Sequence, residues 1–128
     1  MKKEVCILCR SNFSTDEIDK VLTVLKKAGI SPGNITLRNE SSGLVYPEQL
    51  NAIGANIIIV LTDVRIDIPI LVAANLAYVW SLSAAGKHLV FVATTEEAAS
   101  GSLAFLLPTI RLGEESWREK LLRALTIL

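Results

Sequence analysis

The feature that most constrains the fold is the segment "ANIIIVLTD" at residues 55–63. Its centre, Ile57–Leu61, consists only of isoleucine, valine and leucine. A strand with one face in water alternates polar and apolar residues, whereas a continuous aliphatic run is typical of a strand covered on both faces. Strands of that kind belong to parallel sheets, because the helices that connect parallel strands cover the faces. The segment therefore predicts a parallel sheet.

Strand-like and helix-like segments alternate along the rest of the chain. The predicted strands lie at residues 3–9, 35–39, 55–63, 88–94 and 105–112, and the predicted helices at 15–29, 47–54, 69–85 and 113–128. This alternation predicts a three-layer, flavodoxin-like α/β fold with a five-stranded parallel sheet in the order 2-1-3-4-5. A chain of 128 residues has the size of one domain, so we expect residues 1–128 to form a single domain.

Charge and hydropathy bear on the class of partner. Lysine plus arginine equals aspartate plus glutamate, at 13 each, which argues against a nucleic-acid or anionic-membrane partner. The segment 68–86 carries no charge and approaches the length that spans a bilayer. It contains Pro69 and Asn75, however, and lies between two strand-like runs. We interpret it as a helix buried in an α/β domain, with no membrane partner.

The cysteines Cys6 and Cys9 form a Cys-x-x-Cys pair inside the first predicted strand. Residues three apart in a strand point to opposite faces, so the two sulfur atoms should diverge. There is no second cysteine pair, and His88 is the only histidine, so a zinc site lacks ligands. We expect two free thiols in a cytoplasmic protein without a metal or cofactor. The N-terminal residues show no pattern of a secretion signal.

Ligands of such sheets bind beyond the carboxyl ends of the strands, beside the first strand. This rule selects the loops 9–15, 38–43, 62–68, 94–101 and 111–116. In the first loop, Arg10 offers a planar fork for a carboxylate or phosphate. Ser11 and Asn12 add small donors before a helix N-terminus, where anions are favoured. The alternative is an ordinary capped loop without a ligand.

The loop after the third strand carries Asp63, Arg65 and Asp67. Two carboxylates beside an arginine suit a ribose hydroxyl and a phosphate, or they neutralise one another in solvent, which is the interpretation we favour. His88 begins the fourth strand, at the opposite end of the sheet, so we expect a structural or solvent-exposed role for it rather than a catalytic one.

Several segments resemble Toll/interleukin-receptor (TIR) domains and the related nucleoside 2-deoxyribosyltransferase-like group. The segments "VCILCRSNFSTDEIDKVLTVLKKAGI" and "LNAIGANIIIVLTD" resemble the first units of a TIR domain. The segment "NLAYVWSLSAAGKHLVFV" resembles the deoxyribosyltransferase third helix, approximately "E-L-G-Y-A…G-K-P-V". Together they cover roughly 100 residues with short motifs. The resemblance implies a TIR-like α/β domain over residues 1–128.

In both groups a glutamate on the third helix acts on a nucleotide ribose while an N-glycosidic bond is cleaved, and the matching residue here is Asn75. An amide cannot act as a nucleophile or supply a stabilising negative charge. The resemblance therefore implies a catalytically degenerate nucleotide-binding or assembly module rather than an enzyme. A nucleotide or nucleoside would contact Arg10, Ser11, Asn12, Asp63 and Asn75. The alternative is an active nucleoside or NAD N-glycosidase, or a deoxyribosyltransferase, that uses Asp63 or Asp67.

A second resemblance concerns the first loop. The segment "CRSNFST" has the spacing of the phosphocysteine loop in sugar phosphotransferase IIB domains, "C-x-x-G-x-S-T". It implies a phosphocysteine carrier in which Cys9 is the nucleophile, with a thiolate favoured by the helix N-terminus. Asn12 stands where that loop has its glycine.

The predicted helix at 69–85 is apolar on every side, whereas a helix packed on one sheet face needs only an apolar stripe. We predict a homodimer through this helix, with Tyr78 and Trp80 as candidate anchors and the C-terminal "LLRALTIL" as added surface. The alternative is a monomer in which residues 95–104 cover the helix.

Overall fold

The computed structural model describes residues 3–10, 12–40, 54–63, 68–94 and 109–126. One parallel sheet lies at its centre, in the order β2-β1-β3-β4-β5. Its strands are β1 (Val5–Arg10), β2 (Ile35–Glu40), β3 (Ile57–Thr62), β4 (His88–Ala93) and β5 (Thr109–Arg111). The predicted fold class and strand order are confirmed.

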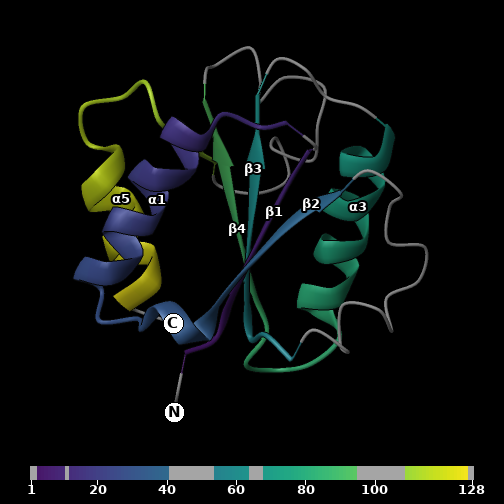
Figure 1. The fold of residues 1–128 in the computed structure, drawn as a ribbon. Coiled ribbons are helices and arrows are strands. Elements are labelled where there is room, and N and C mark those ends of the chain that lie inside the picture. Colours follow the sequence, from purple (N-terminus) through teal and green to yellow (C-terminus); the bar gives the residue numbers. More distant parts are fainter. Residues whose placement is uncertain (1–2, 11, 41–53, 64–67, 95–108, 127–128) are drawn as a thin grey trace.

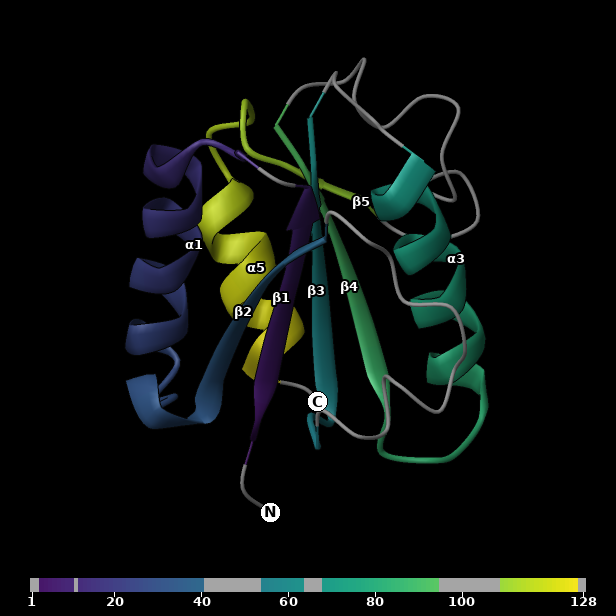
Figure 2. The same cartoon turned by 45° about the vertical axis from the view of Figure 1, so that its right-hand side comes forward.

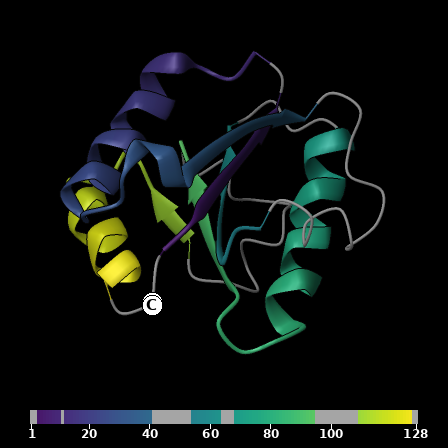
Figure 3. The same ribbon diagram turned by 60° about the horizontal axis from the view of Figure 1, so that its bottom comes forward.

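The helices form two layers on the sheet. Helices α1 (Thr15–Lys27) and α5 (Trp117–Thr126) cover one face, and α3 (Ile68–Leu82) covers the other, as Figures 1 and 2 show. The view in Figure 3 keeps the same separation, with α1 beside α5. A short 3-10 turn, η1 (Pro32–Asn34), leads into β2. The predicted helix at 47–54 falls almost wholly outside the described residues.

The ends of α1 and α3 follow from local chemistry. Gly29, predicted as the stop of the first helix, lies at φ +84°, a conformation that glycine adopts without strain. Helix α3 ends at Leu82, three residues before the predicted end. The reason is Ser83, whose amide and hydroxyl both donate to the Trp80 carbonyl, at 3.1 and 2.7 Å. These bonds satisfy a carbonyl that a further helical turn would have used.

Strand β3 is buried along its whole length, as its aliphatic run predicts. Ile57, Ile59 and Leu61 pack in the cluster under α1 and α5, and Ile58 and Val60 pack in the cluster under α3. The parallel sheet therefore separates two apolar cores.

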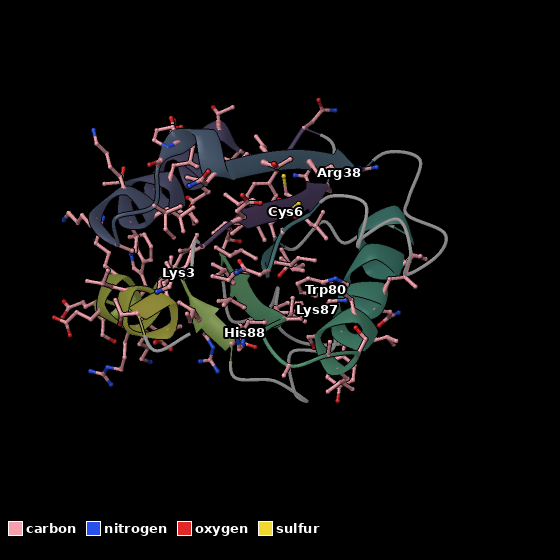
Figure 4. All side chains as sticks on the ribbon, turned by 90° about the horizontal axis from the view of Figure 1, so that it is seen from below. Lys3, Cys6, Arg38, Trp80, Lys87 and His88 are labelled. Atoms are coloured by element: carbon pink, nitrogen blue, oxygen red, sulfur yellow. The ribbon has the colours of Figure 1, made fainter. Side chains whose placement is uncertain are left out.

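The two cysteines lie in different cores, as predicted from their spacing. Cys9 belongs to the cluster under α1 and α5, and Cys6 to the cluster under α3. Neither cysteine forms a disulfide, and both side chains have 0% exposure. Figure 4 labels Cys6 in β1. Within the described part of the chain, no helix has the length and hydropathy needed to span a membrane.

Candidate functional site

Strands β1 and β3 are neighbours, and their carboxyl ends bring Arg10 and Asp63 together. Arg10 Nε lies 3.0 and 3.1 Å from the two carboxylate oxygens of Asp63, and Arg10 Nη2 lies 2.7 Å from Oδ2. The side chains are only 13% and 17% exposed. A forked arginine–carboxylate pair of this geometry is among the strongest polar contacts in proteins. The pair therefore fixes the junction between the first and third strands.

This pair changes what the first loop can do. Arg10 was predicted to bind an external anion, but its fork already engages a carboxylate of the same chain. An incoming phosphate or carboxylate would have to share or displace Asp63. The sequence did not pair these two residues, because Asp63 was grouped with Arg65 and Asp67, which lie outside the described residues. The available signal was their common place at the ends of adjacent strands.

The loop after β1 is shaped by Asn12 and Phe13. Asn12 is exposed at φ +61°, in the left-handed region that asparagine tolerates better than most residues. The buried Phe13 packs its ring 5.9 Å from the Arg10 guanidinium carbon, close enough for a cation–π contact. Ser14, at the N-cap of α1, makes no side-chain capping bond. Ser11 lies outside the described residues.

Cys9 is buried and does not reach the surface at this loop. Its side chain is 0% exposed, and its Sγ lies 4.0 Å from the Arg38 carbonyl on β2. Asn12, which stands where the phosphocysteine loop has its glycine, has a positive φ of 61°. A phosphoryl donor needs access to the sulfur, however, so the burial of Cys9 disfavours the carrier alternative.

Asn75 is not part of the cluster that contains Arg10 and Asp63. Its side chain is exposed, whereas Ala74, Ala77 and Trp80 are buried against the sheet at 3%, 0% and 1% exposure. Successive helical residues are rotated by about 100°, so Asn75 is on the side of α3 turned away from the sheet. The structure thus unites Arg10 with Asp63 but does not bring Asn75 into their cluster.

Trp80, predicted as an anchor of an interface, is instead buried in the core at 1% exposure. It fills the core between α3 and the sheet in the same cluster as Phe91, because only the sheet side offers room for a large apolar ring. Lys87 Nζ lies 5.6 Å from the centroid of that ring. Figure 4 shows these two side chains next to each other beside α3.

Among the described residues, Thr62 Oγ1 and Trp80 Nε1 are buried polar atoms that lack a hydrogen-bond partner. Thr62 is the last residue of β3 and is 4% exposed, directly before Asp63. An unpaired buried hydroxyl costs about 1–3 kcal/mol. Sequence reasoning missed Thr62 because a threonine at the end of a strand is an ordinary residue there.

The loops at the other strand ends contribute less. Glu114, in the turn between β5 and α5, accepts a bond from Lys120 at 2.5 Å, which lowers the pKa of this carboxyl. His88 begins β4 at the amino end of the sheet, as predicted, and its backbone amide donates to the Asn56 carbonyl.

An apolar groove of about 480 Å³ lies between α1 and the edge strand β2, lined by Asp19, Leu22, Thr23, Lys26, Ile30, Pro32, Ile35 and Leu37. Its volume is within the range of small-molecule sites. None of the predicted site residues lines it.

Comparisons with known proteins identify the fold and no more. No family model matches the chain, and no curated protein matches it. The flavodoxin-like domain of a Synechococcus protein is 17% identical, with 96% of this chain and 94% of that chain covered and a TM-score of 0.50. The sugar isomerase domain of the RpiR transcription factor from Sphaerobacter thermophilus is 14% identical, with 98% and 71% covered and a TM-score of 0.56. The chain is therefore a flavodoxin-like α/β protein.

Proposed function

We propose that this chain is a non-enzymatic assembly module that forms a homodimer. The interface consists of α3 and the residues after it up to 85, which is the range 69–85 predicted from the sequence. One observation carries the proposal. Val72, Val79 and Leu82 are 38%, 53% and 70% exposed. Single exposed apolar residues are normal on a protein surface, but a group of large ones on one face indicates an interaction site.

These three residues share one side of the helix. The steps from Val72 through Asn75 and Val79 to Leu82 are three, four and three residues, the spacing with which one helix packs against another. At about 100° per residue they fall within an arc of about 80°, opposite the side that packs on the sheet. We call this set, Val72, Asn75, Val79 and Leu82, the outer stripe.

A second copy of the chain is the partner that suits the outer stripe. Residues 68–86 carry no charge, so two copies meet without like-charge repulsion and a charged partner finds nothing to pair with. The nearest cation in sequence, Lys87, has its ammonium 5.6 Å from the centroid of the Trp80 ring and donates to Ser83 Oγ at 3.2 Å, so it is already engaged within its own chain. The C-terminal helix α5 covers the other face of the sheet, so it does not extend the stripe as predicted.

The expected dimer is weak. Stable dimers bury about 800 Å² per partner, and one face of a 15-residue helix offers less than that. We therefore expect a dissociation constant on the order of micromolar. Tyr78 and Ser83 flank the stripe and would contribute to its rim.

Light scattering of matched variants tests the proposal. Val79→Asp places a charge in the middle of the outer stripe and should give a monomer at concentrations where the wild type is a dimer. Thr23→Asp places the same charge on an exposed position of α1 and should leave the dimer intact. Equal masses for both variants, each unchanged from wild type, would reject α3 as the interface.

Thr62 favours a second candidate function, the binding of a nucleotide or nucleoside at the carboxyl ends of β1 and β3. A ligand hydroxyl or amide could supply the partner that the described residues do not give the Thr62 hydroxyl, beside Arg10 and Asp63. Thr62→Val removes the hydroxyl with little change of shape. It should raise stability by about 1 kcal/mol and abolish binding of NAD or adenosine in calorimetry. Unchanged affinity in Thr62→Val, or no binding by the wild type, would reject this candidate.

A further inference from the structure

The outer stripe of α3 has a polar centre. Asn75 stands three residues after Val72 and four before Val79, and its side chain is exposed between them. Its neighbours in the stripe are all aliphatic. A surface that needed only apolar burial would carry another valine or leucine at this position, so the amide requires its own explanation.

A side-chain amide is complementary to itself. It carries two donor hydrogens and one acceptor oxygen, so two asparagines facing each other can each donate to and accept from the other. A homodimer has two-fold symmetry, and residues near the axis meet their own copies. Asn75 meets its copy if two α3 helices run parallel along the axis. If the helices run antiparallel, Asn75 meets its copy when they cross at Asn75, with Val72 and Val79 on either side of it.

We propose that Asn75 lies at the two-fold axis of the α3 homodimer and pairs with the partner subunit's Asn75, which fixes the register of the two helices. This inference rests on the proposed assembly function. When the register is correct, both amides are hydrogen bonded. A helix shifted along the stripe sets Asn75 against Val72 or Val79 of the partner subunit and leaves buried amides unpaired, at a cost of about 1–3 kcal/mol each.

The amide therefore selects one closed dimer. An entirely aliphatic stripe could slide, or could pack with other apolar surfaces in open-ended assemblies. Asn75 lowers the affinity of the dimer somewhat and excludes those alternatives, as a single polar residue does in a helix–helix seam. A glutamate at this position, as in the proteins of the TIR-like resemblance, would instead bring two negative charges together, and this uncharged interface could not stabilise them.

Cysteine cross-linking of the full chain tests this position. The native thiols, Cys6 and Cys9, are 0% exposed and do not compete. Asn75→Cys places an exposed thiol on the axis, where its Cα can approach its copy within about 7 Å, as a disulfide requires. Paired thiols react at an effective concentration near millimolar, so oxidation by diamide should form covalent dimer about a hundredfold faster than in Thr23→Cys on α1.

The outcomes separate the two proposals. If Val79→Asp dissociates the dimer but Asn75→Cys cross-links no faster than Thr23→Cys, assembly through α3 stands and the position of Asn75 is rejected. If the wild type is monomeric throughout, both are rejected. Asn75→Leu supplies a second measurement, since it should keep the dimer mass but add larger species in sedimentation. A single sharp dimer in Asn75→Leu would contradict the register role.

Discussion

Arg10 and Asp63 join the carboxyl ends of the neighbouring strands β1 and β3, with Arg10 Nη2 2.7 Å from Asp63 Oδ2 and the side chains only 13% and 17% exposed. Such a pair has two consequences. It positions the start of the loop after β3. It also engages the Arg10 guanidinium, the group that a phosphate ligand would otherwise bind. An ion pair within the chain therefore stabilises the carboxyl edge of this sheet.

Removal of Asp63 should destabilise the protein. In Asp63→Ala the largely buried guanidinium loses the carboxylate that it engages, and we expect the free energy of unfolding to fall by about 2–3 kcal/mol in urea denaturation. The control is Glu17→Ala, which breaks the exposed Lys20–Glu17 contact at 3.3 Å and should cost about 0–1 kcal/mol. Equal losses in the two variants would mean that the Arg10–Asp63 pair contributes no more than a surface ion pair.

The protein should not cleave NAD or nucleosides. Asn75 has no carboxylate and faces away from the sheet, so even Asn75→Glu should release no nicotinamide from NAD, as chromatography would detect. The expected result is product at the level of the buffer blank for both proteins. Wild-type turnover that disappears in Asp63→Asn would instead establish the N-glycosidase alternative, with Asp63 as its acid.

The two native thiols should be slow to alkylate. Cys6 and Cys9 have 0% exposure, so iodoacetamide should label them only when the fold opens, and labelling should accelerate with sub-denaturing urea. Mass spectrometry of labelled peptides measures each site. Rapid, urea-independent labelling of Cys9 at neutral pH would indicate an accessible thiolate and revive the phosphocysteine carrier.

The turn before α5 should contribute to stability in a pH-dependent way. The Lys120 ammonium, through its hydrogen bond, holds the pKa of the Glu114 carboxyl below its unfolded value of 4.5. A lowered pKa means that Glu114 binds its proton more tightly in the unfolded chain than in the folded one. The contribution of this carboxylate to stability is therefore complete above the unfolded pKa of 4.5 and disappears as the pH falls through the folded pKa. Urea midpoints at acid pH should therefore fall slightly more steeply in the wild type than in Lys120→Gln. Identical slopes would contradict this linkage.

The fold was predictable from local patterns, whereas the contacts at its edge were not. The aliphatic run of β3 and the alternation of elements specify a parallel sheet, and Gly29 marks the end of α1, because burial and backbone freedom act within a few residues. The pairing of Arg10 with Asp63 joins residues 53 positions apart, so it depends on strand order and side-chain direction. Helix periodicity alone could not separate the two sides of α3, since both are apolar.

Trp80 illustrates this limit. Its size suggests an interface anchor, yet it packs at 1% exposure under α3, while the smaller Val79 beside it is 53% exposed. The rotation of a helix with little amphipathic contrast is set by which side chains the sheet can accommodate, and that information lies in β1 and β4 rather than in the helix.

Sedimentation equilibrium of the wild-type chain, from about 1 µM to about 1 mM, tests self-association through α3 most directly. We predict a mass that rises from monomer to dimer and stops there, with a dissociation constant on the order of micromolar, and a Val79→Asp variant that remains monomeric. A wild-type chain that stays monomeric across this range, or a Val79→Asp variant that dimerises equally well, would contradict the proposal.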